Sequence, residues 1–393
     1  MQTVKTLNNI APRGISILEK RGFAIDNETE DPDGILVRSA KLHDQEFPPS
    51  LRAIARAGAG VNNIPVDRCT DEGVVVFNTP GANANSVKEL VIAGLLLSSR
   101  QIYQGLAWTH SLSPEEPEVG KLVEKEKKRF AGPEIAGKRL GVIGLGAIGV
   151  MVANAATGLD MEVVGFDPFI SVESAWGLHR GVERAKNLEA LLKSCDYITI
   201  HIPLNDNTRN MISTDQFKVI KKGARLLNFA RGGLVDNAAL LRAIDDKLVS
   251  AYVTDFPEAE LLGREEVLCV PHLGASTPEA EENCAVMASE QIADYLEAGN
   301  IRNSVNFPDC YMEMSCDYRL TIANRNIPNM VGQITAVLAE EEINIAELLN
   351  RHKGDIAYNI IDIDTPASER AIERIASIEG VIMVRAISKS KED

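Results

Sequence analysis

Residues suited to acid–base chemistry and to carboxylate binding follow short apolar segments in the second half of the chain. Arg231 follows residues 224–230, His272 ends the segment 267–272, and several carboxylates lie between them in 254–263. If the apolar segments are parallel strands, these side chains meet at the carboxyl edge of one sheet, where open α/β sheets bind ligands. An imidazole exchanges protons near neutral pH, and a guanidinium binds a carboxylate through two parallel hydrogen bonds. The pattern therefore predicts a site for proton transfer on a carboxylate-bearing substrate.

A glycine-rich turn lies upstream of these residues. The sequence "GLGAIG" (144–149) matches G-x-G-x-x-G and continues an apolar segment that begins at residue 138. Gly144 permits the tight turn, Gly146 lets a pyrophosphate approach the backbone, and Gly149 lets helix and strand pack closely. The helix that follows offers N–H groups and a partial positive charge to phosphates. We interpret the segment as a dinucleotide-binding turn.

Asp167 indicates which dinucleotide binds. It ends the next apolar segment, 161–167, at 18 positions after Gly149. A carboxylate at this spacing accepts hydrogen bonds from the adenosine ribose and repels a 2′-phosphate. The residues "DPFISVES" contain no arginine that could accommodate that phosphate. The predicted cofactor is therefore NAD rather than NADP.

The elements that must position these residues alternate between short apolar strands and helical patterns. This alternation predicts an α/β fold with a doubly wound parallel sheet. A smaller α/β region, 1–84, precedes a long helix in which Ser86 and Glu89 fit a capping box. The polar residues 111–130 predict a solvated connector. The strands expected in the main sheet are 138–146, 161–167, 197–203, 224–230, 249–256 and 267–272.

The last part of the chain has its own pattern of elements. It reads strand, helix, strand, strand, helix, strand, which predicts a small separate α+β domain after residue 316. The expected strands are 318–324, 344–352, 356–364 and 381–387, and the helices fall near 330–341 and 368–378.

Composition and charge narrow the class of protein. The 393 residues are 45% hydrophobic and 25% charged, as in globular chains of two or three domains, and the net charge of −15 argues against nucleic acid as a partner. The longest apolar stretch, 90–97, is too short to cross a bilayer, and the first residues lack a signal core, so we expect a mature start and no membrane partner. The six cysteines form no CxxC pair and have no histidine at zinc-ligand spacing. They predict reduced thiols, a cytoplasmic location and no metal site.

Together these motifs resemble the D-isomer-specific 2-hydroxyacid dehydrogenases, and within them the branch that acts on 3-phosphoglycerate. The resemblance covers about residues 1–305 and implies NAD-dependent oxidation of 3-phosphoglycerate to 3-phosphohydroxypyruvate, the first step of L-serine biosynthesis. The matching segments are "GLGAIG" with Asp167, "HIPLNDNTRNMI" (201–212), "NFARGGLVD" (228–236), "VPHLGASTPEAEENC" (270–284), "RAGAGVNNI" (56–64) and "NTPGANANSVKEL" (78–90).

The resemblance also implies an architecture. A flavodoxin-like substrate domain, 1–84 and 275–305, surrounds an inserted Rossmann-type NAD domain, 85–274, and residues 316–393 resemble a ferredoxin-like ACT domain. Such domains are often regulatory, so we expect an L-serine effector and a homodimer or homotetramer. Asn326 and Asn344 match effector-binding positions, whereas Asn329 stands where serine-sensing members have glycine.

The family pattern assigns roles to individual residues. His272 donates a proton when the 2-keto acid is reduced and accepts one when the 2-hydroxy acid is oxidised, while Arg231 holds the carboxylate and the C2 oxygen. The acid that pairs with the imidazole is Glu260, with Glu258 as second choice, because two ways of counting along the loop disagree. The implied substrate-binding residues are Arg38, Ser39, Gly60 and Asn85, with Ala40 where relatives often have a second arginine, and Lys41 after it. The implied cofactor-binding residues are Gly144, Gly146, Ala147, Ile148, Gly149, Asp167, His201, Pro203, Thr208, Phe229, Ala230, Arg231, Asp255, His272, Gly274 and Ala275.

Two other functions stay open on the sequence. The chain could act on another D-2-hydroxy acid, such as glycerate or lactate, with the same fold and cofactor. It could also be an NAD-sensing scaffold, because transcriptional corepressors use this fold. An ACT domain favours amino-acid metabolism over the scaffold.

Overall fold

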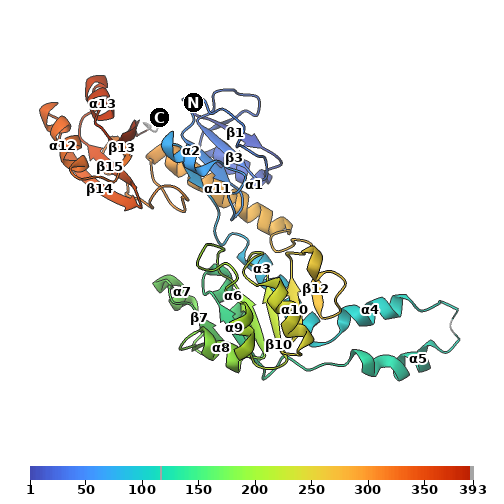
Figure 1. The fold of residues 1–393 in the computed structure, drawn as a ribbon. Coiled ribbons are helices and arrows are strands. Elements are labelled where there is room, and N and C mark those ends of the chain that lie inside the picture. The colour runs from blue at the N-terminus through green and yellow to red at the C-terminus, as the bar shows by residue number, and fades with distance from the viewer. Residues whose placement is uncertain (116, 390–393) are drawn as a thin grey trace. The chain divides into compact units, whose positions relative to one another are not determined.

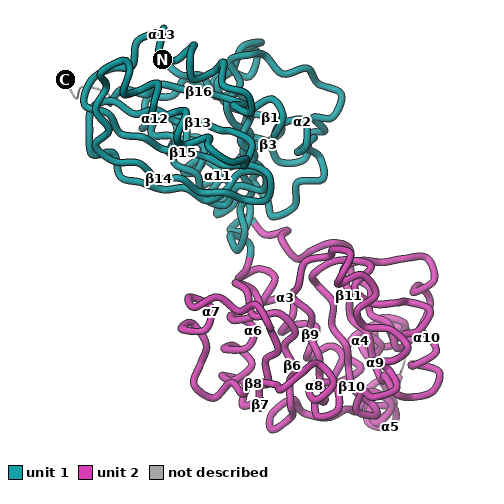
Figure 2. Tube along the Cα trace, turned by 60° about the vertical axis from the view of Figure 1, so that its left-hand side comes forward, with its two compact units in different colours: residues 1–83, 278–393 teal, residues 84–277 magenta. Residues whose placement is uncertain are grey.

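The computed structural model describes residues 1–115 and 117–389, and it divides the chain into two compact units. Unit 1 comprises residues 1–83 and 278–393, and unit 2 comprises residues 84–277 (Figures 1 and 2). The predicted fold class is confirmed: parallel α/β sheets occur in both units, and an antiparallel sheet follows at the C-terminal end.

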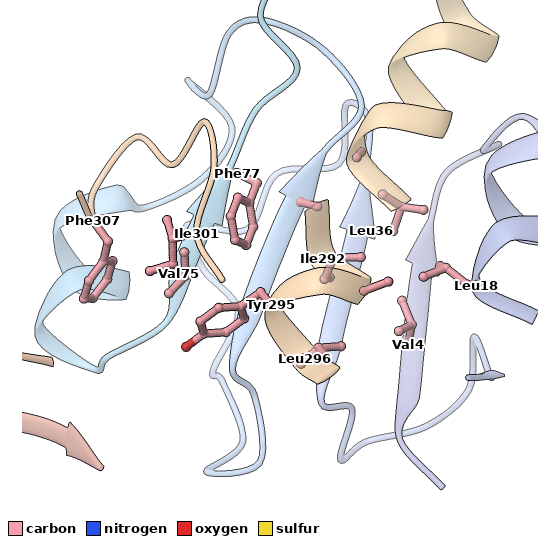
Figure 3. Close-up of a cluster of buried hydrophobic side chains, with 14 of the residues drawn as sticks. Val4, Leu18, Leu36, Val75, Phe77, Ile292, Tyr295, Leu296, Ile301 and Phe307 are labelled. Carbon is pink, nitrogen blue, oxygen red and sulfur yellow. The ribbon is translucent and has the colours of Figure 1, made fainter. Parts of the chain in front are cut away.

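The N-terminal sheet of unit 1 is parallel and has the order β2-β1-β3-β4-β5, the flavodoxin-like order. Its central strands are nearly continuous buried apolar residues, as expected of strands covered on both faces. Figure 3 shows Ile292, Tyr295 and Leu296 of one long helix packed against the sheet residues Leu36 and Phe77. The elements are β1 (Thr3–Leu7), α1 (Pro12–Lys20), β2 (Ala24–Ile25), β3 (Gly34–Val37), β4 (Ala53–Arg56), α2 (Val66–Asp71), β5 (Val75–Phe77) and the long helix α11 (Pro278–Ala298).

The C-terminal sheet of unit 1 is antiparallel and has the order β14-β15-β13-β16. The predicted order of strands and helices is observed, with one face of the sheet packed on the N-terminal core. Tyr358 and Met383 belong to the same buried cluster as Phe77. The elements are β13 (Tyr318–Arg325), α12 (Met330–Glu340), β14 (Ile345–Lys353), β15 (Ile356–Ile363), α13 (Glu369–Ala376) and β16 (Val381–Ser388).

Unit 2 is built on a parallel sheet with the order β12-β11-β10-β9-β6-β7-β8. The chain reverses its direction of winding between β6 and β9, which creates the crevice at the carboxyl ends where doubly wound sheets bind ligands. The strands are β6 (Arg139–Ile143), β7 (Glu162–Phe166), β8 (Glu183–Arg184), β9 (Tyr197–Ile200), β10 (Ala224–Asn228), β11 (Val249–Thr254) and β12 (Val267–Cys269). The helices are α3 (Ala84–Ser99), α4 (Ile102–His110), α5 (Val119–Glu126), α6 (Ala147–Thr157), α7 (Val172–Gly177), α8 (Leu188–Ser194), α9 (Thr214–Val219) and α10 (Asn237–Asp245), with short 3-10 turns η1 (Lys127–Phe130) and η2 (Ala259–Leu261).

Two local predictions differ from the structure. Helix α3 begins at Ala84, so Ser86 is buried inside its first turn and Glu89 accepts a hydrogen bond from Asn85 instead; the predicted capping box is wrong. The polar residues 111–130 contain the helix α5, whose charged face the sequence pattern did not distinguish from a loop. Among the described residues, none of the helices is both long and apolar enough to cross a membrane.

Candidate active site

The glycine turn between β6 and α6 is shaped to admit a ligand. Gly144 has a φ of +90°, and a Cβ there would lie 2.5 Å from the carbonyl oxygen of His201. A Cβ on Gly149 would lie 1.9 Å from the carbonyl oxygen of Gly144, so only glycine fits. A Cβ on Gly146 would meet nothing within 4 Å, and no side chain caps the helix that starts after it. Open space in front of uncapped N–H groups suits a phosphate.

Asp167 directly follows β7 and holds the turn from the side. Its carboxylate accepts a hydrogen bond from the backbone N–H of Leu145, at 2.8 Å, and another from that of Phe169, also at 2.8 Å. Each carboxylate oxygen retains a second lone pair, so the residue can still accept hydrogen bonds from ribose hydroxyls. The position of Asp167 fits the predicted cofactor contact. The hydrogen bond from the Leu145 N–H was not predicted from the sequence.

Arg231 is exposed and follows β10, and a buried residue fixes its loop. The Asn228 amide donates to the Arg231 carbonyl at 2.8 Å and accepts from the N–H of Ala230 at 3.2 Å. The same amide approaches the hydroxyl of Tyr252 on β11 at 3.4 Å, and burial raises the pKa of that hydroxyl to about 12. The sequence assigned no separate role to Asn228, although a polar residue at the end of an apolar strand indicates a position near a ligand site.

Asp255, at the end of β11, holds the loop that carries His272. Its side chain is 1% exposed, and Oδ2 accepts a hydrogen bond from the N–H of Gly274 at 3.1 Å. Its other oxygen, Oδ1, is buried without a hydrogen-bond partner among the described residues. Burial raises the pKa of Asp255, and the Gly274 N–H and the charges of His272 and Arg231 oppose that rise. A buried acceptor without a partner beside His272 fits the carboxamide of a nicotinamide.

His272 is exposed on its loop, and its ring contacts that of Phe256, with the centroids 4.9 Å apart and the ring planes tilted by 53°. The predicted pairing with Glu260 is not formed in the structure, nor is the alternative with Glu258. Both glutamates are exposed, and His272 forms no ion pair with any carboxylate of the described chain. Glu260 lies exposed on the short turn η2, and the ring next to the imidazole is that of Phe256.

His201 follows β9 and lies under the glycine turn. Its backbone N–H donates to the carbonyl of Ile143 at 2.7 Å, and the ring atom Nε2 is hydrogen-bonded to the Thr199 hydroxyl at 2.9 Å. The residue is half-buried, but Nδ1 is shielded from water and has no partner among the described residues. Desolvation lowers the pKa of His201 to about 3, so the ring is neutral at physiological pH.

The remaining cofactor-binding candidates surround the same crevice of unit 2. The Thr208 hydroxyl donates to the carbonyl of Pro203 at 2.7 Å and closes the turn after β9. Phe229 is buried against the helix α3, where a Cβ on Gly94 would lie 3.1 Å from its ring. Ala147 is exposed at the start of α6, and Ile148, Ala230 and Ala275 are half-buried.

The predicted substrate residues fall in both units. In unit 1, Arg38 is paired with Glu281 at 2.5 Å, Ser39 is exposed after β3, and the Gly60 carbonyl accepts a hydrogen bond from Arg56 at 2.5 Å. In unit 2, the side chain of Asn85 is occupied by the neighbouring helix residues Lys88 and Glu89.

The effector candidates lie on loops of the C-terminal sheet. The Asn326 amide donates to the carbonyl of Gly354 at 3.3 Å, and the Asn344 carbonyl accepts from the N–H of Asp364 at 3.4 Å. Asn329 has a φ of +70°, the left-handed conformation that glycine would supply. Asparagine tolerates this region better than most residues, so the loop keeps the shape expected with glycine.

Comparison with known proteins shows which families and proteins this chain resembles. Residues 93–274 match the model for the D-isomer specific 2-hydroxyacid dehydrogenase, NAD binding domain. A D-3-phosphoglycerate dehydrogenase of Methanocaldococcus jannaschii is 34% identical over 366 residues, covering 91% of this chain and 66% of its own. One from Archaeoglobus fulgidus is 35% identical over 349 residues, covering 84% and 63%. The chain thus spans less than two thirds of the length of these relatives.

A solved structure has the same fold. The NAD+-bound 3-phosphoglycerate dehydrogenase of Entamoeba histolytica superposes with a TM-score of 0.60 and 26% sequence identity. The match covers 78% of this chain and 98% of that one.

Proposed function

Since this chain belongs to the D-isomer-specific 2-hydroxyacid dehydrogenase family, we propose that it oxidises 3-phosphoglycerate to 3-phosphohydroxypyruvate with NAD+, the first step of L-serine biosynthesis. One observation supports this most. Arg231, Asp255 and His272 follow the carboxyl ends of three adjacent strands in the domain whose glycine turn fits a dinucleotide. The choice of 3-phosphoglycerate as the substrate follows the names of the similar D-3-phosphoglycerate dehydrogenases.

The chemistry follows from these three side chains. Arg231 binds the substrate carboxylate and C2 oxygen through its guanidinium, which keeps C2 in one orientation. His272 accepts the proton of the C2 hydroxyl during oxidation and returns it during reduction, as an imidazole can act as base and as acid. NAD+, when bound, would supply the hydride acceptor for C2. Asp255 holds the His272 loop through Gly274 and offers Oδ1 to the cofactor amide.

A substrate panel tests the proposal. Purified protein and NADH are assayed with 3-phosphohydroxypyruvate, hydroxypyruvate, pyruvate and glyoxylate, and kcat/KM is compared. We expect the phosphorylated keto acid to be preferred by at least about 100-fold, the ratio that a charged group buried in contact with its partner supports. A preference for an unphosphorylated keto acid would replace the proposal with another 2-hydroxyacid dehydrogenase activity.

Glu260 is proposed as the acid that pairs with His272 during turnover. It forms no ion pair with described residues and lies on the same loop as Phe256, the residue that contacts the imidazole. A carboxylate there would raise the pKa of His272 and keep it protonated for ketone reduction. Replacing Glu260 by Gln should then move the alkaline limb of kcat/KM to lower pH, and Glu258→Gln should not. An unmoved limb in Glu260→Gln would remove the assignment.

We propose that the chain forms a homo-oligomer through an arm of unit 2. The arm comprises residues 101–115 and 117–130. Figure 1 shows α4 and α5 extending away from the body of this unit. Neither helix buries a residue, and Tyr103 and Leu106 are 62% and 55% exposed. Apolar side chains on a projecting arm suit a second copy of the chain. Light scattering should show a dimer or tetramer for the wild type and a smaller species for Leu106→Asp; a monomeric wild type would contradict this.

Serine binding and a cytoplasmic location complete the proposal. The left-handed Asn329 preserves the loop beside Asn326, and the six cysteines are free, which suits a reducing compartment. Calorimetry with L-serine on the full chain should give a saturable heat that Asn344→Ala abolishes. No heat up to millimolar serine would make the C-terminal domain structural or specific for another ligand.

A further inference from the structure

Tyr252 lies on β11, two residues before the strand ends, and it is 2% exposed. The register of the sheet pairs Asn228 at the end of β10 with Thr254 at the end of β11. Because side chains alternate between the two faces of a strand, Tyr252 lies on the same face as Thr254, and Asn228 shares that face. Three buried polar side chains thus lie side by side at the carboxyl edge of the sheet in unit 2.

Asn228 connects this group of polar side chains to the loop of Arg231. The amide nitrogen of Asn228 donates to the carbonyl of Arg231 at 2.8 Å and lies 3.4 Å from the Tyr252 hydroxyl. Burial raises the pKa of that hydroxyl to about 12, and the adjacent side chains of Asn228 and Thr254 oppose the rise. The hydroxyl therefore keeps its proton at neutral pH. It can accept a hydrogen bond from Asn228 and donate one to Thr254.

Thr254 connects the same group to the ring that contacts His272. The Thr254 hydroxyl oxygen accepts a hydrogen bond from the N–H of Phe256 at 3.1 Å. The ring of Phe256 contacts the imidazole of His272, with the centroids 4.9 Å apart. Phe256 also borders the loop of Arg231, because a Cβ on Gly232 would lie 3.6 Å from the Cβ of Phe256. The polar group therefore reaches both of the loops that carry reactive side chains.

We propose that Tyr252 is a positioning residue, whose buried hydroxyl links the loop of Arg231 to the loop of His272. The inference rests on the proposed function and adds a residue that acts on the reaction through others. A substrate held by the guanidinium of Arg231 presents its C2 hydroxyl to the imidazole at a distance that the two loops set. A displacement of about 1 Å between reacting groups can lower the rate by about 100-fold, so the spacing of the loops controls turnover.

The change Tyr252→Phe tests this role, because it removes the hydroxyl and keeps the ring. kcat and KM are measured with NADH and the 2-keto acid that the wild type reduces best, and the Kd of NADH is measured by fluorescence titration. We expect kcat to fall by about 10-fold or more, because the two reactive groups lose their fixed spacing. KM and the Kd of NADH should stay within about 2-fold, because the guanidinium and the glycine turn are retained.

Tyr197→Phe is the matched control. Tyr197 is fully buried at the start of β9 in the same sheet, and its hydroxyl is hydrogen-bonded to the Ser99 hydroxyl at 2.7 Å. The change removes a buried hydroxyl at the amino edge of the sheet, so it should lower the free energy of unfolding without lowering kcat. An equal fall of kcat in both variants would assign the effect to a general loss of stability and overturn the inference.

Thr254→Val tests the path from Tyr252 to Phe256, because it removes the hydroxyl between them and keeps the shape of the side chain. If both hydroxyls act on one path, the double variant should have a kcat close to that of the slower single variant. Losses that multiply in the double variant would overturn the link. An unchanged kcat in Tyr252→Phe would overturn the inference and leave the proposed function standing. A wild type that reduces none of the 2-keto acids with NADH would overturn both.

Discussion

At the scale of single residues, the exposed reactive side chains are positioned by buried neighbours. Arg231 donates to the carbonyl of its own neighbour Ala230, and Asn228 fixes its loop from below. His272 likewise depends on Asp255, whose buried carboxylate holds Gly274. The reactive groups are thus accessible to substrate while buried neighbours hold their backbone in place. Substitutions of the reactive residues should therefore affect catalysis, whereas substitutions of the buried neighbours should affect the conformation of the loops.

Replacing Arg231 by Gln should lower kcat/KM by about 100-fold or more while leaving NADH binding nearly intact, because a charged partner of the carboxylate is lost. Steady-state kinetics and NADH fluorescence titration measure the two quantities. Arg242→Gln, on the exposed face of α10, is the matched control and should behave as the wild type. Normal turnover in Arg231→Gln would place the carboxylate anchor elsewhere.

The low pKa of His201 predicts that the free energy of unfolding falls as the solution becomes acidic. Its pKa is about 3 in the folded chain and ordinarily 6.5, so the unfolded chain binds a proton first as pH falls. The contribution is therefore complete above pH 6.5 and is lost progressively down to about pH 3. Between pH 7 and 5 the wild type should lose about 2 kcal/mol more of its free energy of unfolding than His201→Asn, by urea denaturation. Equal losses would show that the imidazole is protonated in the fold.

At the scale of elements, the β6–α6 turn and the end of β7 act as one structure. Sequence spacing alone predicted the three glycines and Asp167, because each serves a backbone geometry that few other residues allow. It did not predict that Asp167 hydrogen-bonds Leu145, since that contact depends on how β7 lies beside β6. The capping box at Ser86 failed for a related reason: the helix begins two residues earlier, and packing buries the serine.

Asp167→Ala should narrow the preference for NADH over NADPH by about 10-fold, because it removes the repulsion of a 2′-phosphate. The loss of the bond to Leu145 will lower activity with both cofactors, so the ratio of the two kcat/KM values is the measurement. Glu173→Ala, an exposed carboxylate on the nearby helix α7, controls for a general change of charge. An unchanged ratio would mean that another residue sets cofactor choice.

Sequence patterns captured the fold class well and the site only in part. Alternation of buried strands with helices predicted both parallel sheets, because the pattern is local. The pairing of Glu260 with His272 was counted along the loop from the family pattern and stays a prediction, because a count of positions does not reveal that the ring of Phe256 contacts the imidazole.

At the scale of the whole molecule, the C-terminal sheet is joined to unit 1 through the end of α11. Arg319 on β13 donates to the carbonyl of Ala298 at 2.9 Å, and the Tyr358 hydroxyl donates to that of Gly299 at 2.8 Å. Arg385 on β16 hydrogen-bonds the carbonyls of Tyr295 and Leu296. These donors satisfy the carbonyls that every helix leaves unpaired at its end. The C-terminal sheet is thus part of one folded body with α11.

The fully buried pair of Arg319 and Asp362, 2.5 Å apart, makes this junction testable. Arg319→Met leaves the carboxylate buried without its guanidinium and should cost about 3–5 kcal/mol of the free energy of unfolding. The double change Arg319→Met with Asp362→Leu should cost less than the single one, because no charge is then left unpaired. Chemical denaturation of the full chain compares them, and a single variant as stable as the wild type would disprove the structural role.

The most direct test of the account follows the hydrogen at C2. 3-Phospho-D-glycerate that carries deuterium at C2 is oxidised by the protein with NAD+ in ordinary water, and the cofactor is analysed by mass spectrometry. Hydride transfer between C2 and the nicotinamide predicts one deuterium in each reduced cofactor and none released to water. Deuterium in the solvent, or no reduction of NAD+ by this substrate, would contradict the central claim.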